Sequence, residues 1–458
     1  MKPSEFISNV DEHPFVGASS SRLVNMYKSS NPSYKYKHVF DNFPGWTVFS
    51  SPVASSCRGA VTFKDHLYVV VGHSIYKITE GGAATLLGAI STSEGPVSMA
   101  ENGFEIMLAD GDKMWRYDGA VLSTPTMPFS EGPSKVIFHE GYFVTLRPNT
   151  SQFYISGSFD GNTWNALQFA TAEDKPDNIV ELTSDRLLWL FGEYTTQAYD
   201  TYPDTFPFKP NYTGRVLYGI RGRTAAQLSN TTYFLGSAKT GRGVTVYRFN
   251  GFQPEPVSGP GYSKLWSSFS DIDDAYAMSF SWDGQEFYLL TFPVTNRSFV
   301  YSPAGGWSEW GEWNEDQNTW TKHPALWFTV IGDETVFGDA HGNIMKLDRS
   351  TTLHNGNTNV RQVISDTYHQ NPQRVHIGLL EMDMEVGYHD ADTTPTVFLA
   401  VSKDGGNTFG NDIPRTQGDA GWYDTRVRWV RLGSGYNMVF RLSVSDDFNW
   451  RLQGGIVQ

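Results

Sequence analysis

The sequence predicts an all-β protein, an irregular β-propeller followed by a C-terminal antiparallel β-sandwich. Three observations predict this class. The 458 residues are 15% aromatic and contain 44 glycines, whereas only 18% are charged, and this composition is typical of strands and tight turns. A unit of two short apolar strands around a Gly/Asp/Asn turn recurs at intervals of 38 to 54 residues. Segments of helical period are absent at any length, and the C-terminal part shows plain period-two alternation.

Residues 1–57 are predicted to be an extended segment with the first strands, and residues 58–350 to be the propeller. The repeated hairpin begins at seven places, namely His66, Phe104, Tyr142, Leu187, Thr232, Glu286 and Glu334. Their spacing leaves room for four short strands in each unit, as in a propeller blade. The seven hairpins indicate about seven blades, while six blades with an irregular linker stay open as an alternative. No Gly-His…Trp-Asp signature recurs, so the blades are not WD40 units.

Residues 351–458 are predicted to form a separate β-sandwich. The composition changes after Asp348, and the polar, turn-rich segment 349–362 is expected to be a linker or a solvent-exposed loop. Five segments with clear period-two alternation follow, at 379–386, 396–402, 426–432, 438–445 and 450–457. None of them repeats the blade hairpin, and such strands are typical of an antiparallel sandwich.

Net charge and cysteine content exclude several function classes. The formal charge is −14 and the isoelectric point is near 5.2, which does not suit tight binding of nucleic acid through neutralised phosphates. Cys57 is the only cysteine, so an internal disulfide and a Cys-based zinc site are both excluded. The apolar runs are too short for a transmembrane helix, and residues 1–15 lack the apolar stretch of a secretory signal. We therefore expect a protein that folds in a cytosol without membrane insertion.

Two segments resemble the turn motif called the Asp-box. Ser402, Asp404 and Gly406 fit the full S-x-D-x-G-x-T-F spacing, and Asp160 and Gly161 belong to a shorter copy that lacks one residue. In this turn the Asp accepts backbone hydrogen bonds, the Gly supplies a positive φ, and the aromatic residue closes the base. Sialidases carry such boxes, which raises a glycosidase hypothesis. We interpret both segments as structural turns, because the box is a folding element that also occurs outside enzymes.

The sequence contains no recognisable catalytic constellation. In the run 307–320, tryptophans alternate with acids, and the candidate carboxylates for a sugar site are Glu309, Glu312, Glu315 and Asp316. Nothing fixes the separation of two of them, so we interpret the run as blade-edge packing with solvated acids. Metal-ligand spacing, phosphate-binding glycine loops and a G-x-S-x-G elbow are also missing. We therefore expect no enzyme, no cofactor and no metal.

The densest basic segment contains Arg215, Arg221 and Arg223. Such a cluster more often lies in a solvated loop or faces an acidic partner than binds DNA. We therefore treat these three residues as candidates for a contact with a channel or a partner.

The order of motifs along the chain resembles the tail nozzle proteins of short-tailed bacteriophages, also called packaged-DNA stabilisation proteins. The segments that carry the resemblance are 21–27, 43–49, 57–78, 95–103, 169–182, 187–200, 206–208, 218–220, 246–251, 287–293, 402–410 and 424–433. They cover nearly the whole chain in the same order. One departure is the sequence VYSPAGGW from Val300, where such proteins have an aromatic–Asp pair, and it puts the shape of that blade in doubt.

The resemblance implies a structural, non-enzymatic protein of the virion tail, made in the cytoplasm of a bacterial host. It implies a homohexameric ring below the portal and the head-to-tail adaptor, which extends the DNA channel and helps to retain packaged DNA. Tailspikes or fibres would attach around this ring, a distal plug or needle would lie below it, and DNA would pass through without specific binding. The alternative is a carbohydrate-binding or glycoside-cleaving propeller, and a third hypothesis is receptor binding by the ring itself.

Overall fold

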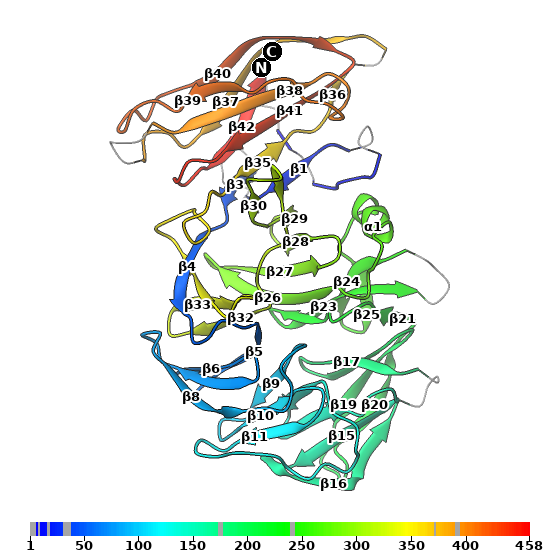
Figure 1. Cartoon of the computed structure of the whole chain (residues 1–458). Coiled ribbons are helices and arrows are strands. Elements are labelled where there is room, and N and C mark those ends of the chain that lie inside the picture. The colour runs from blue at the N-terminus through cyan, green and yellow to red at the C-terminus, as the bar shows by residue number, and fades with distance from the viewer. Residues whose placement is uncertain are drawn as a thin grey trace.

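The computed structural model of the chain describes residues 6–7, 10–15, 19–30, 38–172, 177–238, 243–370, 372–389 and 394–458. These residues form a propeller and a sandwich that lie one above the other (Figure 1), and they confirm the predicted fold class. Residues 173–176 and 239–242, which belong to two of the predicted motifs, lie outside the described residues.

Seven blades form the propeller within the described residues, as the seven hairpins predicted. The first four are meanders of four consecutive strands. Blade one consists of β5 (Cys57–Phe63), β6 (His66–Val71), β7 (Ser74–Ile78) and β8 (Ala84–Ala89), and blade two of β9 (Ser98–Glu101), β10 (Ile106–Ala109), β11 (Met114–Tyr117) and β12 (Leu122–Ser123). Blade three consists of β13 (Val136–His139), β14 (Tyr142–Leu146), β15 (Gln152–Gly157) and β16 (Asp160–Thr171). Blade four consists of β17 (Ile179–Ser184), β18 (Leu188–Gly192), β19 (Thr196–Thr201) and β20 (Phe208–Val216).

The last three blades are less regular. Blade five contains β21 (Tyr218–Ile220), β22 (Ala226–Leu228), β23 (Thr231–Ala238), β24 (Thr245–Asn250) and β25 (Gln253–Pro256), and blade six contains β26 (Tyr276–Trp282), β27 (Gln285–Phe292), β28 (Arg297–Ser302) and β29 (Gly306–Glu309). Blade six therefore has its four strands despite the unusual sequence after Val300. Blade seven combines β32 (Trp327–Ile331), β33 (Glu334–Gly338) and β34 (Ile344–Asp348) with the N-terminal strand β4 (Gly45–Ser50).

Strand β4 closes the propeller, because it pairs antiparallel with β34 and brings Trp46 opposite Leu347. The innermost strands β5, β9, β13, β17, β22, β26 and β32 then contact one another in turn, and β32 meets β5 to complete the circle. Because blade seven combines strands from the two ends of the propeller, the ring of blades is closed. An open row of blades would leave sheet edges exposed.

The sandwich has two sheets, and both contain N-terminal strands. One sheet has the order β2 (Met26–Ser30), β3 (His38–Asn42), β42 (Leu452–Val457), β37 (Val375–Met384), β40 (Val427–Gly435). The other has β1 (Arg22–Val24), β35 (Arg361–Ile364), β41 (Asn437–Val444), β38 (Thr396–Ser402) and β39 (Ile413–Thr416), and β36 (Tyr368–His369) also pairs with β41. The predicted segment 1–57 is therefore divided between the sandwich, which takes β1 to β3, and the propeller, which takes β4.

Strand β1 also joins the two domains. It pairs parallel with β29 of blade six and antiparallel with β35 of the sandwich, so one sheet runs from the propeller into the sandwich. Asn25 ends this strand with a φ of 57° and is fully buried. Its side chain donates to Asn359 Oδ1 at 2.8 Å and accepts from the Gly311 amide at 2.9 Å. An αL conformation is tolerated best by Gly, Asn and Asp, which explains an asparagine here.

The polar segment 349–362 links β34 of the propeller to β35 of the sandwich, as one of the two expectations had it, but it is not an entirely solvent-exposed loop. Thr352, His354, Asn359 and Arg361 are almost completely buried. The His354 ring stacks on Trp46, with ring centroids 3.6 Å apart. Short-range composition cannot reveal this, because the segment is covered by β4 and the sandwich, which come from distant parts of the chain.

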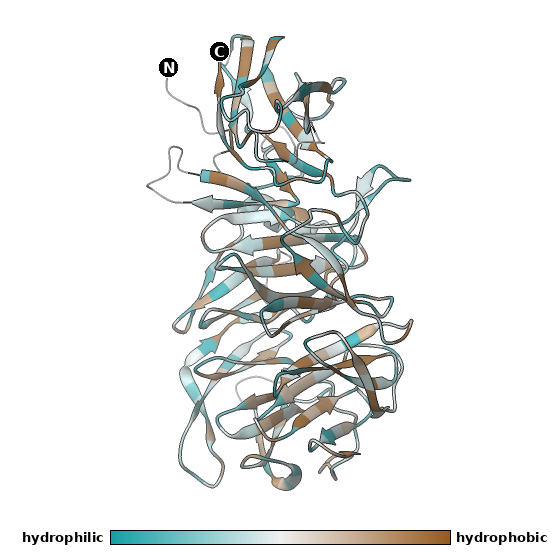
Figure 2. Ribbon diagram, turned by 90° about the vertical axis from the view of Figure 1, so that its left-hand side faces the viewer, coloured by the Kyte–Doolittle hydropathy of each residue, from teal (hydrophilic) through white to brown (hydrophobic). Residues whose placement is uncertain are grey.

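The predicted absence of helix is wrong at one place. Residues Pro260–Ser267 form helix α1, which begins with proline at its first position and buries Tyr262 and Trp266. Two aromatic residues four positions apart face the same side of a helix, but eight residues are too few for a visible period. Both rings pack into the largest apolar core, which continues through blades five and six into the sandwich. Figure 2 shows hydrophobic residues along the strands of both domains, with hydrophilic residues interspersed among them.

Candidate functional site in the central cavity

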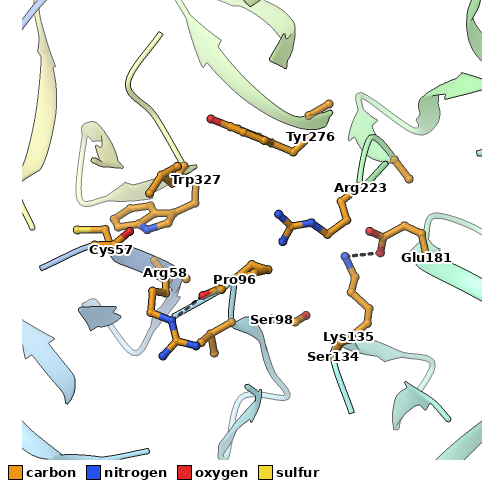
Figure 3. Close-up of a pocket in the computed structure, with 18 of the residues that line it drawn as sticks. Cys57, Arg58, Pro96, Ser98, Ser134, Lys135, Glu181, Arg223, Tyr276 and Trp327 are labelled. Carbon is orange, nitrogen blue, oxygen red and sulfur yellow. Dashed lines mark hydrogen bonds and ion pairs between the residues drawn. The ribbon is translucent and has the colours of Figure 1, made fainter. Parts of the chain in front are cut away.

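The innermost strands of the seven blades surround a cavity on the propeller axis. Its volume is about 440 Å³, and every blade contributes to its wall. Figure 3 shows Trp327 on one side, Arg223, Lys135 and Glu181 on the opposite side, and Tyr276 between them. Because consecutive blades present their first strands to the axis, residues about one repeat apart in the sequence meet here.

A cationic pair and one carboxylate occupy the side of blades three to five. Lys135 Nζ lies 2.6 Å from Glu181 Oε1, and the Glu181 side chain is buried. The Arg223 guanidinium points into the middle of the cavity (Figure 3). Burial lowers the pKa of Arg223, and the nearby Glu181 carboxylate opposes that effect. Arginine nevertheless stays charged in proteins, so this side of the cavity carries a net positive charge.

Arg58 adds a third cation to the cavity wall. Its guanidinium donates to the backbone carbonyls of Gly72, Thr92, Glu94 and Gly95, and to the Thr92 hydroxyl. Burial lowers its pKa. Neutral acceptors take its hydrogen bonds, but the nearby Asp110 and Glu94 carboxylates also act on its charge and oppose the lowering of its pKa. The positive potential of the cavity therefore comes mainly from Arg223 and Lys135.

Cys57 and Tyr276 line the cavity as neutral groups. Burial raises the pKa of the Cys57 thiol to about 12, and its sulfur lies 3.6 Å from the Asn343 carbonyl oxygen, to which it donates. Burial also raises the pKa of Tyr276 to about 12, and its hydroxyl donates to the Ala325 carbonyl at 3.1 Å. The thiolate is the reactive form of cysteine, so Cys57 is not an activated nucleophile.

The three predicted arginines do not form one patch. Arg215 is exposed on β20, the fourth strand of blade four, with its guanidinium over the Tyr212 ring. Arg221 lies between β21 and β22, donates to Ser237 Oγ at 2.9 Å and pairs with Asp273 at 3.4 Å. Only Arg223 reaches the central cavity. They separate because the chain passes within these few residues from the outermost strand of one blade to the innermost strand of the next.

The turn at Asp404 has the geometry of an Asp-box. Asp404 accepts from the Ser402 hydroxyl at 2.6 Å, from the Thr408 hydroxyl at 2.6 Å and from the Thr408 amide at 3.0 Å. These hydrogen bonds lower the pKa of Asp404 to about 2. Gly405 and Gly406 have φ angles of 77° and 96°. The aromatic residue, Phe409, is only half-buried, and the Arg441 guanidinium covers it.

The shorter copy at Asp160 differs in one respect. Asp160 accepts from the Asn162 amide at 2.9 Å and the Thr163 hydroxyl at 2.7 Å, and the Trp164 indole donates to the Gly161 carbonyl at 2.8 Å. Trp164 is buried, but the positive φ belongs to Phe159, at 51°, rather than to Gly161. In this copy, which is one residue shorter, the residue with a positive φ therefore precedes Asp160 instead of following it.

The sequence predicts that all acids of the run 307–320 are solvated, and this prediction is wrong for Glu309. Glu309 is buried, and its two carboxylate oxygens accept hydrogen bonds from Arg22 and Arg297. These two cations hold the pKa of Glu309 down at about 2, against the effect of burial. Burial raises the pKa of Glu312, whereas Glu315 and Asp316 are exposed. A carboxylate with both oxygens engaged by arginine is a poor general acid or base, so Glu309 does not support a glycosidase couple.

Sequence reasoning missed Arg58, Lys135 and Glu181 as cavity residues. A signal existed, because Lys135, Glu181 and Arg223 stand roughly one blade repeat apart and each lies in or just before the first strands of its blade. Aligning the blades on their hairpins would have brought these charged positions together.

Across the described ranges, no group of three or more His, Cys, Asp or Glu side chains is placed to hold a metal ion. In the same part of the chain, no helix is long and apolar enough to cross a membrane.

Comparison with protein families decides the relationship of the chain. The family model described as bacteriophage P22 Gp10, β-propeller, matches residues 18–352, and the one described as bacteriophage P22 Gp10, β-sandwich, matches residues 361–458. The chain belongs to the P22 Gp10 family. The members are phage tail nozzle and DNA-stabilisation proteins, so this chain is a structural component of a phage tail. Both halves of the predicted resemblance are thereby confirmed.

Other comparisons add little to the family assignment. No curated protein sequence matches the chain directly. Among solved structures, a streptogramin B lyase is 11% identical with a TM-score of 0.46, covering 66% of this chain and 97% of its own. The Neurospora crassa Pan2 WD40 domain is 10% identical with a TM-score of 0.43, covering 68% and 97%. Similarity at this level carries no argument about function.

Proposed function

We propose that this family member forms the nozzle ring of a short-tailed phage tail, assembled as a homohexamer below the portal and its head-to-tail adaptor. The observation that carries the proposal is the match of both Gp10 domains, in order, along nearly the whole chain. In this role the ring extends the DNA channel and helps to retain packaged DNA. Synthesis in the host cytoplasm and attachment of tailspikes or fibres, with a distal plug or needle, belong to the same proposal.

The rigid connection between the propeller and the sandwich supports a mechanical role in the tail. A nozzle has to keep its shape while DNA under pressure passes through it, so its domains should not move independently. Here the sheet that includes β29, β1 and β35 crosses the domain boundary, and one apolar core continues from blades five and six into the sandwich. Both features favour a single stiff subunit over two flexibly linked domains.

Exposed aromatic side chains provide contact area for neighbouring subunits. Phe104 and Phe159 are 64% and 53% exposed, and their rings form an edge-to-face pair with centroids 6.3 Å apart. They come from the turns of blades two and three. Aromatic residues are enriched at the centres of protein interfaces, so we propose this pair as one subunit contact of the ring.

The test is the assembly state of the purified chain, alone and with the portal–adaptor complex, measured by mass photometry and negative-stain imaging. We expect hexamers, or hexamers that form on the adaptor. Phe104→Ser combined with Phe159→Ser should abolish or strongly reduce assembly while the subunit stays folded, with a small loss of melting temperature because Phe159 also packs on Phe138. Val330→Ser, at another exposed apolar residue, should assemble normally. A chain that stays monomeric and adds no density below the adaptor would refute the nozzle role.

A further inference from the structure

The central cavity holds more positive than negative charge, in a protein whose total charge is −14. Of the described residues that line it, Arg58, Lys135 and Arg223 are cationic and Glu181 is the one carboxylate. Lys135 already pairs with Glu181, and the donors of Arg58 are used by neutral acceptors. The described residues give the Arg223 guanidinium no hydrogen bond and no ion pair. A cation that is partly desolvated and unpaired favours an anion beside it.

The geometry around Arg223 fits a group with two oxygens. Its planar guanidinium can bind both oxygens of a carboxylate side by side. Lys135 has three N–H donors and uses one for Glu181, so it can share a second anion. Figure 3 shows the Arg223 guanidinium and the Lys135 ammonium facing the same part of the cavity.

The opposite wall is apolar and aromatic. Trp327 and Leu326 of blade seven and Ala60 of blade one contribute to it. Figure 3 shows Trp327 across the cavity from Arg223. The cavity volume of about 440 Å³ falls in the usual range for sites of small organic ligands, roughly 300 to 1,000 Å³. An occupant with a charged head on one side and an apolar body on the other would satisfy both walls.

We propose that the central cavity binds a small organic carboxylate, whose charged group pairs with Arg223 and Lys135 and whose apolar body packs against Trp327. Bound in this way, the ligand links blades three, five and seven across the propeller axis and stabilises the closed ring of blades. This site lies inside a single subunit and does not depend on assembly of the hexamer.

The test uses the full chain with benzoate as the probe and benzamide as its neutral analogue of the same shape, at constant ionic strength. We expect benzoate at saturation to raise the melting temperature by about 2 to 4 °C and to give a dissociation constant below 1 mM by calorimetry, roughly the level reached by well-placed small ligands. Benzamide should have no effect. Equal effects of the two compounds, or no binding of either, would overturn the proposal.

Three variants assign the site. Arg223→Gln should weaken benzoate binding at least about tenfold, while Arg221→Gln, two residues away and outside the cavity, should leave it unchanged. Ser134→Phe keeps all charges but fills the cavity, so it should abolish binding even if Arg223→Gln fails to fold. Unchanged binding in Ser134→Phe would place the ligand elsewhere. Phosphate or acetate that stabilises as strongly as benzoate would reduce the site to general anion binding and would refute the carboxylate-plus-apolar recognition.

Discussion

Glu309 is the residue at which three strands, β1, β28 and β29, meet. Its carboxylate accepts from Arg22 on β1 at 2.8 Å and from Arg297 on β28 at 2.7 Å, and Arg297 also pairs with Glu12 at 2.6 Å. The same residue is the parallel partner of Val24 in the sheet that crosses the domain boundary. A buried charge with all its partners in place fixes one register between these segments, whereas removing one partner leaves charges uncompensated.

We therefore expect Glu309→Gln to lower the free energy of unfolding by about 3 kcal/mol, because Arg22 and Arg297 would lose their carboxylate in a largely buried site. The exposed Asp316→Asn, in the same sequence run, serves as the control. Urea unfolding of both variants measures the difference. A cost below about 1 kcal/mol, as for surface ion pairs, would mean that the network contributes little.

The same network predicts a pH dependence. The pKa of Glu309 is lowered in the folded protein, to about 2, so its contribution is present above the ordinary pKa of the unfolded chain, near 4.5, and is lost as the pH falls towards 2. Unfolding experiments between pH 6 and 3 should show a smaller acid-induced loss in Glu309→Gln than in the original chain. Parallel curves for the two proteins would contradict the assignment.

Asp404 makes a smaller, local prediction. Asp404→Ala removes the acceptor that holds the turn between Ser402 and Thr408, at a cost of about 1 kcal/mol. Gly406→Ala should cost a similar amount, because alanine is strained at a φ of 96°. Thermal melts should fall by a few degrees for both, and not for the exposed Asp419→Ala. Unchanged melts would show that this turn is not a determinant of the sandwich fold.

At the scale of elements, strands β1 and β4 form long-range pairings that no local sequence pattern indicates. Strand β4 completes blade seven with a partner about 300 residues later in the chain, and β1 lies between β29 and β35. Closing such a long loop costs entropy before any contact compensates for it. The stability of the propeller therefore depends on the pairing of its N-terminal strands β1 and β4.

A cross-link can test the pairing of β4 with β34. Thr47 is directly opposite Lys346 in the register, so Thr47→Cys combined with Lys346→Cys should form a disulfide under oxidising conditions. By constraining about 300 residues in the unfolded chain, it should stabilise the protein by about 2 to 4 kcal/mol. Melting with and without reductant measures the effect, and Thr47→Cys alone is the control. Failure to cross-link would contradict the closure.

The sequence could predict those elements whose partners are near in the chain. The segment 396–402 coincides with β38, and the repeated hairpins correspond to the second and third strands of the blades. The strands β1 and β35 were not assigned individually, because their partners lie hundreds of residues away or in the other domain. The strands β2 and β3 pair with each other, but they carry no repeat that separates them within the predicted segment 1–57. The cavity was missed for the same reason, since Lys135, Glu181 and Arg223 meet only after the ring closes.

At the scale of the whole molecule, propeller and sandwich act as one body with an acidic surface. The N-terminal residues Phe6, Ile7 and Val10 belong to the same apolar core as Trp429 and Trp450 of the sandwich. The central cavity, whose wall carries positive charge, has a volume of about 440 Å³, a space far too small for a DNA duplex. Its cations therefore do not reveal how the outer surface interacts with DNA.

The net charge leads to the prediction about DNA. In the proposed nozzle role, the channel should not bind phosphate tightly, because a surface that neutralised several phosphates would bind duplex with a steep salt dependence. With a net charge of −14, and with Arg215, Arg221 and Arg223 in three separate environments, we expect weak or no duplex binding at physiological ionic strength. Titration of labelled duplex into the assembled protein at several salt concentrations measures this.

Two sets of variants would locate any binding that does occur. Arg215, Arg221 and Arg223 changed together to alanine test the basic segment singled out from the sequence. Arg426 and Arg428, exposed at the edge strand β40 of the sandwich and next to it, test a second basic surface. Sub-micromolar binding that weakens steeply with salt and vanishes in the first set would make that segment a DNA clamp. Loss in the second set would instead place the DNA on the sandwich. Either result would contradict the proposed channel wall, which DNA passes without being held, because the protein's own cations would then bind the DNA.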